Sequence, residues 1–272
     1  MVTNSETAVL DAHIALGRER RFLGASALLF AASAIATVFW CGRMSGGMPM
    51  PGGWTMSMAW MRMPGQSWIG AAITFMGMWL VMMMAMMLPS LVPALSVYRR
   101  SIRGSGETYL AWLTALASAG YFFIWTVFGA TAYSAALVLL AVEMRWPVLA
   151  RSVPTVIGTV LLLAGSIQLT AWKARELGRC RNASACALSL SLGARNAWTH
   201  GLRLGVHCCL CCSGFMMLLL VTGVMRLSAM AIVAAAITVE RLAPRPECAA
   251  RVTGAVVIAA GVLMVSRALG MT

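Results

Sequence analysis

Long, uninterrupted apolar runs constrain the fold of this chain more than any other feature of its sequence. Hydrophobic residues make up 60% of the chain and charged residues only 11%. A helix needs roughly 20 apolar residues to cross about 30 Å of hydrocarbon, and several runs are close to this length or longer. We therefore predict an all-α fold, a polytopic bundle of six or seven transmembrane helices, with seven favoured.

The apolar runs define the expected spans. Seven candidates are 22–40, 69–97, 109–140, 155–172, 203–225, 228–239 and 252–269. The third is too long for one upright helix, so we expect it to tilt or to break near Gly129. The sixth is short, and in the six-span alternative it is a re-entrant segment.

Charge sets the expected orientation. The chain carries a net charge of +13, but its arginines sit mainly at the ends of apolar runs, which favours a role in topology over nucleic-acid binding. With seven spans, most basic residues fall on one side, which the positive-inside rule assigns to the cytoplasm. We expect a cytoplasmic segment at residues 1–21 and one transmembrane domain at residues 22–272. Its first span would be a retained anchor in a bacterial inner membrane.

Methionine is concentrated in two neighbouring stretches, which together hold fourteen of the 22 methionines. Seven lie between Met44 and Met63, inside the expected external loop 42–68, where no core needs filling. Thioethers are soft donors that select Cu(I), so Met48, Met50 and their neighbours could collect copper. The alternative is a loop that lies on the bilayer surface and is anchored by Trp54, Trp60 and Trp68.

The second span contains the other seven methionines. Met78, Met82 and Met86 recur every four residues and share one helix face, whereas Met76, Met83 and Met87 form a neighbouring stripe. The first stripe could be a ladder of copper ligands, although methionine also packs well between helices. Pro89 and Pro93 remove backbone hydrogen bonds in the same span, so we expect a kink there.

Four cysteines and a histidine lie within a later apolar run. The run reads His207-Cys208-Cys209-Leu210-Cys211-Cys212. On a helix, Cys208, Cys211 and Cys212 face one direction because they are three and four residues apart, and His207 lies four residues before Cys211. Three thiolates, or two thiolates and an imidazole, would suit Cu(I), with zinc as the alternative metal. Small apolar packing by the thiols is the simpler alternative.

Three further features accompany this cluster. Gly201, Gly205 and Gly214 would let a neighbouring helix approach it closely. Cys180 and Cys186 lie in an expected cytoplasmic loop, where we interpret them as ordinary reduced thiols. Glu240 would pair with Arg241 or an arginine of the next loop, or would take part in proton movement.

Three strings resemble a known family. MWLVMMMAMMLPSLVPAL, LLLAGSIQLTAWKARELGRCR and GLRLGVHCCLCCSGFMMLLLVTGVMRLSAMAIVAAAITVERLAP are similar, in order and spacing, to the predicted metal-binding integral membrane proteins (domain of unknown function 2182). The resemblance covers roughly residues 40–246. It implies a helical membrane protein with a metal site on Cys208, Cys211 and Cys212, and no established activity. Glu176 stands where the family commonly has cysteine, and Ser213 where it commonly has tryptophan.

The leading functional hypothesis is Cu(I) handling by Met and Cys ligands, either uptake, transfer or delivery to a copper enzyme. A structural or assembly subunit of a larger membrane complex is the alternative. A membrane thiol oxidoreductase ranks lower because adjacent cysteines in a helix form a strained disulfide. We therefore favour a protein that is not an enzyme, with the bilayer, a metal ion and other membrane proteins as its partners.

The distribution of basic residues predicts the orientation of the chain in the membrane. A reporter fused at Ser105 or Ala183 should be cytoplasmic, and one fused at Gly52 should be external, because arginine-rich segments stay inside. Paired reporters that are active on opposite sides of the membrane measure this directly. A cytoplasmic signal from the Gly52 fusion would contradict the assignment.

Overall fold

The computed structural model of the chain describes residues 4–43, 47–49, 55–57, 65–102, 106–182 and 193–270. Within these ranges the fold is helical, as expected, apart from one pair of short strands. The helices are α1 (Asn4–Arg43), α2 (Trp68–Ser101), α3 (Glu107–Arg145), α4 (Pro147–Gln168), α5 (Ala171–Asn182), α6 (Ala194–Thr222), α7 (Leu227–Leu242) and α8 (Pro246–Ala268). The strands are β1 (Gly47–Pro49) and β2 (Thr55–Ser57).

Five helices in the described ranges are long and apolar enough to cross a membrane. They are contained in α1, α2, α3, α6 and α8, and the count becomes six if α4 and α5, bent by 67° at their junction, form one broken span. The sixth expected span, 228–239, is not among them because α7 has only 16 residues, a length of about 24 Å at 1.5 Å per residue. The described helices therefore give five or six candidate spans.

Helix α3 does not break at Gly129 but runs without interruption from Glu107 to Arg145. The absence of a side chain at Gly129 instead makes room for the indole of Trp79, whose Nε1 donates to the carbonyl of Trp125 at 2.9 Å. Helix α2 contains Pro89 and Pro93 and continues as helix through both. Helix α1 begins at Asn4 and contains a candidate span, Leu16–Arg43.

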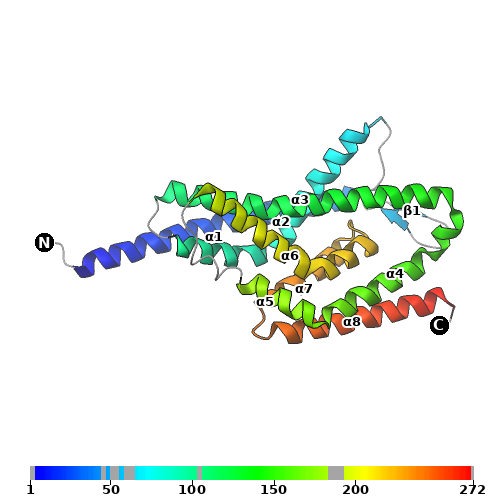
Figure 1. The fold of residues 1–272 in the computed structure, drawn as a ribbon. Helices are drawn as coiled ribbons and strands as arrows, with labels where there is room; N and C mark the ends of the chain where they lie inside the picture. The colour runs from blue at the N-terminus through cyan, green and yellow to red at the C-terminus, as the bar shows by residue number, and fades with distance from the viewer. Residues whose placement is uncertain are drawn as a thin grey trace.

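The bundle is assembled from helix pairs that are visible in Figure 1. The long helix α3 lies against α6, and α4 and α8 run side by side at the other edge of the bundle. Helices α1 and α2 pack together, and α5 and α7 fill the space near α6. The core lies between α2, α3, α6 and α7, where tryptophan, tyrosine and methionine side chains are almost fully buried.

Glycine sets the distance between paired helices. A Cβ on Gly201 would lie 2.0 Å from the carbonyl oxygen of Ala117, and a Cβ on Gly205 would lie 3.0 Å from that of Tyr121. Gly214 similarly faces Ala164 of α4. The predicted close approach to the cysteine-bearing helix is therefore confirmed, and small residues achieve it as they do in other membrane helix pairs.

Replacing Gly201 with alanine should destabilise the fold. The added methyl group would collide with a backbone carbonyl, which cannot move without shifting α3, and overpacking of this kind typically costs about 1–3 kcal/mol or more. Gly77→Ala is the matched control, because nothing lies within 4 Å of its Cβ. Thermal unfolding in detergent should show a lower midpoint for Gly201→Ala only. Equal midpoints in both variants would contradict the close α3–α6 contact.

Candidate functional site

The three predicted thiols lie together on the buried face of α6. Cys208, Cys211 and Cys212 are 0%, 2% and 1% exposed, whereas Cys209 is only partly buried and lies off this face. The thiol of Cys212 interacts with those of Cys208 and Cys211. The helical spacing in the sequence therefore predicted correctly which cysteines share a face.

Close packing of α3 against α6 brings a tyrosine to this cluster. Gly205 lets the backbone of Tyr121 approach α6, and Cys208 lies three residues further along the same face. The hydroxyl of Tyr121 is consequently 2.8 Å from the sulfur of Cys208. An O–H group at this distance can donate to a thiolate and stabilise its negative charge.

Other helices add a thioether, a thiol and two cations. The sulfur of Met87 on α2 lies 4.0 Å from that of Cys208. The thiol of Cys180 on α5 interacts with that of Cys211. Arg241 on α7 points one guanidinium nitrogen at Cys212, 3.7 Å from its sulfur. Lys173 on α5 donates to the carbonyl oxygen of Cys211 at 2.6 Å.

His207 has a carboxylate partner on α5. Its Nδ1 is 3.3 Å from a carboxylate oxygen of Glu176, and its side chain is 32% exposed. Glu176 is itself buried and also pairs with Arg179. A carboxylate at one ring nitrogen orients an imidazole and leaves the other nitrogen for a metal, so the role of His207 as a ligand stays a prediction.

A buried ion pair lies next to the cluster. Lys173 and Glu240 are 2.8 Å apart, and each side chain is 2% exposed. Thr253 donates to Glu240 at 2.7 Å, and Gln168 donates to the same carboxylate at 3.4 Å. Glu240 is therefore paired with a lysine and not with either of the arginine partners that the sequence suggested. Lys173 is a core residue.

Both methionine stripes of α2 are largely buried. Met78, Met82 and Met86 are 6%, 2% and 3% exposed, and Met83 and Met87 are completely buried. Burial alone does not distinguish a ligand ladder from packing, since methionine does both. The contact of Met87 with Cys208 brings the second stripe, rather than the expected first one, to the thiols.

For the methionines of segment 44–63, the structure describes no side chains and only part of the backbone. Met48 lies in β1, where its backbone pairs in register with Met56 of β2, and Met50 falls outside the described residues. A second pair of sulfur atoms lies close by in sequence. Cys41, near the end of α1, donates to the sulfur of Met230 on α7 at 3.9 Å, and both residues are buried.

In the part of the chain that the structure describes, no group of three or more His, Cys, Asp or Glu side chains is arranged to hold a metal ion. The sulfur atoms instead form a series of neighbouring, interacting groups from Cys180 through Cys211 and Cys212 to Cys208, which contacts Met87. Every described cysteine is a free thiol. Such a chain offers several adjacent soft donors, which suits an ion that moves by exchanging ligands.

Several residues of this site were missed by sequence reasoning. Cys180 was interpreted as an unremarkable thiol, and Tyr121, Lys173 and Arg241 were not connected with the cluster. One signal was present for Lys173, the chain's single lysine, which lies just after an apolar run. The others come from helices distant in sequence, so no local spacing indicates their contacts.

Comparison with known proteins adds the last observation. No curated protein and no solved structure matches the chain significantly. The PpoB2 family, described as copper chaperone, matches residues 76–264, which is more than half of the chain. The match begins in the α2 methionines and includes every residue of the sulfur chain described above, while the Met-rich segment 44–63 lies outside it. A copper-related family agrees with the metal site that the sequence resemblance implied, and on this match the chain belongs to the PpoB2 family of copper chaperones.

Proposed function

We propose that this chain is an integral membrane copper chaperone that holds Cu(I) on buried sulfur ligands and passes it to another protein. The observation that carries the proposal is the convergence of three α6 thiols with Cys180 and Met87 at a site shielded from water. The family's description as copper chaperone supports copper over zinc as the metal. No observation favours the alternatives of a structural subunit or a thiol oxidoreductase.

The proposed ligands are Cys208, Cys211 and Cys212, with the thioether of Met87. In a site with metal–sulfur bonds of about 2.3 Å, two sulfur ligands lie about 4 Å apart. Cys208 and Met87 already have this separation. Three thiolates and one Cu(I) leave a net charge of −2, and the guanidinium of Arg241 beside Cys212 compensates part of this buried negative charge.

We place the chain in a bacterial inner membrane, as one helical domain over residues 22–272 with a cytoplasmic N-terminus. Five helices long and apolar enough to cross a bilayer support this placement. The loop at residues 42–68 would then face outward, and its methionines, Met48 and Met50 among them, would collect copper. The Cys41–Met230 sulfur pair lies next to this loop in sequence and supports a first internal position for the ion.

Methionines of α2 would connect the two sulfur sites. Thioethers bind Cu(I) more weakly than thiolates do, so an ion would move from Met78, Met82 and Met86 towards the cysteines of α6. From there we propose that copper is delivered to a copper enzyme. This order of affinities favours movement from the methionine loop to the thiol cluster and requires no energy source.

Removing the three thiols should abolish the tightest copper site. The variant with Cys208, Cys211 and Cys212 all changed to Ser should lose high-affinity Cu(I), because hydroxyl groups are hard donors that Cu(I) binds poorly. The measurements are copper stoichiometry under reducing conditions and X-ray absorption, which should show sulfur neighbours in the wild-type protein. Cys248→Ser is the matched control, since Cys248 is exposed on α8. Unchanged stoichiometry in the triple variant would rule out these ligands.

Changing methionine to leucine should separate ligand function from packing. Leucine has nearly the same volume, and such exchanges usually cost under ~1.5 kcal/mol. The triple variant of Met78, Met82 and Met86 should therefore fold but move less copper, and Met87→Leu should weaken binding at the thiols. Changing Met76 and Met83 should matter less.

The measurement for these variants is copper accumulation in proteoliposomes at matched protein levels. Met217→Leu serves as the control because Met217 is 54% exposed on α6. Wild-type copper movement in the Met78, Met82 and Met86 variant would show that these side chains only fill space.

A further inference from the structure

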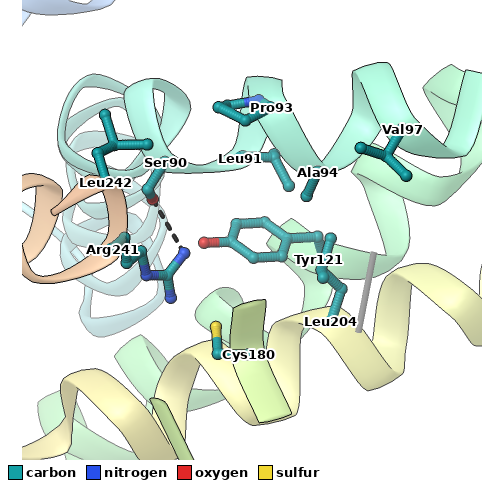
Figure 2. Close-up of a pocket in the computed structure, with 10 residues that line it drawn as sticks. All are labelled: Ser90, Leu91, Pro93, Ala94, Val97, Tyr121, Cys180, Leu204, Arg241 and Leu242. Carbon is teal, nitrogen blue, oxygen red and sulfur yellow. Dashed lines mark hydrogen bonds between the residues drawn. The ribbon is translucent and has the colours of Figure 1, made fainter. Parts of the chain in front are cut away.

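A cavity of about 300 Å³ lies beside the thiol cluster and is bounded by α2, α3, α5, α6 and α7. Most of its wall is aliphatic, including Leu91, Pro93 and Leu204. Four side chains supply its polar groups, Ser90, Tyr121, Cys180 and Arg241, and Figure 2 shows them facing one another at one end. Aliphatic walls with a few convergent polar groups are typical of sites for small molecules.

Cys180 links this cavity to the copper ligands. Of the described cysteines, it alone lines the cavity, and its thiol interacts with that of Cys211. Cys211 in turn is linked to Cys212 and Cys208. A metal ion that exchanged onto Cys180 from the cavity could therefore reach the α6 thiols by successive exchange between neighbouring sulfur atoms.

The electrostatics of the cavity favour anions. Arg241 lies in the wall, where it donates to Ser90 at 3.0 Å, and its buried Nε has no hydrogen-bond partner. None of the lining residues is a carboxylate. The neighbouring Glu240 is bound by Lys173, and in the described part of the chain Arg241 makes no ion pair. A free cation entering the cavity would meet an uncompensated guanidinium, whereas an anion would be stabilised by it.

We propose that this cavity is an anion-selective port, in which a small anionic thiolate complex of Cu(I) transfers its metal to Cys180. The inference rests on the proposed function, and it adds a second route to the thiol cluster beside the α2 methionines, with the chemical class of the copper carrier and the residue that receives the ion. A volume of about 300 Å³ is at the lower limit of small-molecule sites, so the carrier is a small thiol and not a folded protein.

The exchange balances without any redox step. A Cu(I) ion held by two carrier thiolates has one negative charge, and copper forms a bond to the sulfur of Cys180 as one bond to a carrier sulfur breaks. The proton of the Cys180 thiol passes to the departing thiolate, which leaves as a neutral thiol. The mixed complex keeps one negative charge beside Arg241, and copper remains Cu(I) throughout.

The first test measures charge selectivity without copper, on the full-length protein in detergent. Two methanethiosulfonate reagents of similar size, one with a sulfonate and one with a trimethylammonium group, are compared at Cys180 and at the exposed Cys248 by peptide mass spectrometry. For each cysteine, the rate with the anionic reagent is divided by the rate with the cationic reagent. This ratio should be about tenfold higher at Cys180 than at Cys248, because a charged group in a cavity wall changes the local concentration of ions by about tenfold or more.

Substitutions at Arg241 identify the source of this selectivity. Arg241→Gln should lower the rate ratio at Cys180 to that of Cys248, while Arg241→Lys should preserve it because the charge is kept. The ratio at Cys248 should stay the same in both variants. Equal ratios at the two cysteines in the wild-type protein, or failure of both reagents to reach Cys180 while Cys248 reacts, would overturn the port.

The second test measures loading with copper. Cu(I) is supplied either as its complex with glutathione, an anionic thiol, or as the cationic acetonitrile complex. In Cys180→Ser, the rate of copper loading from the glutathione complex should fall by about tenfold. Electrostatic attraction into a charged site raises association rates by about tenfold or more, and the variant would no longer use this site. Loading in Cys248→Ser should match the wild type, and the wild type should prefer the glutathione complex.

The two tests distinguish failure of the port from failure of the proposed function. If the wild-type protein binds copper but Cys180→Ser loads at the same rate, copper does not enter through Cys180 and the port is wrong while copper binding stands. If the wild-type protein binds no copper from either source, the proposed function is wrong, and with it the transfer to Cys180. The reagent ratios would then still report whether the cavity selects anions.

Discussion

The buried ion pair between Lys173 and Glu240 is the constraint on which the arrangement of the site depends. Both charges are shielded from solvent, so removing either partner would leave the other uncompensated, which typically costs about 3–5 kcal/mol. The pair joins α5 to α7, and Gln168 and Thr253 extend it to α4 and α8. Because Lys173 also donates to the carbonyl of Cys211, the same network holds the turn of α6 that carries the thiols.

This pairing also determines which charge faces the sulfur atoms. Glu240 is occupied by Lys173, so its neighbour Arg241 is left to contact Cys212 and Ser90. A cation without a carboxylate partner is costly in an apolar bundle unless an anion compensates it. A thiolate-bound Cu(I) ion would supply that anion at the cluster, and an anionic carrier would supply it in the cavity. The guanidinium of Arg241 would therefore stabilise negative charge at two places, the copper-loaded thiol cluster and the carrier in the cavity.

Close contact between helix backbones completes the site. Gly201 and Gly205 let α3 approach α6 until the hydroxyl of Tyr121 reaches Cys208. Larger side chains at these positions would separate the helices and withdraw the tyrosine from the sulfur. The glycines therefore position a hydrogen-bond donor for the thiols, in addition to packing the bundle, and the thiol-bearing face of α6 depends on them.

The sequence by itself determined the helical fold and the shared buried face of Cys208, Cys211 and Cys212, because the length of an apolar run and a spacing of three and four residues are local properties of a helix. It also indicated the close approach at Gly201 and Gly205. Only the tertiary structure decided that Cys180 and Met87 join the thiols, that His207 turns to Glu176, and that Glu240 pairs with Lys173. These partners come from different helices. Which of them meet depends on how the helices pack and on how buried charges pair, and the local spacing of residues in the sequence indicates neither the packing nor the pairing.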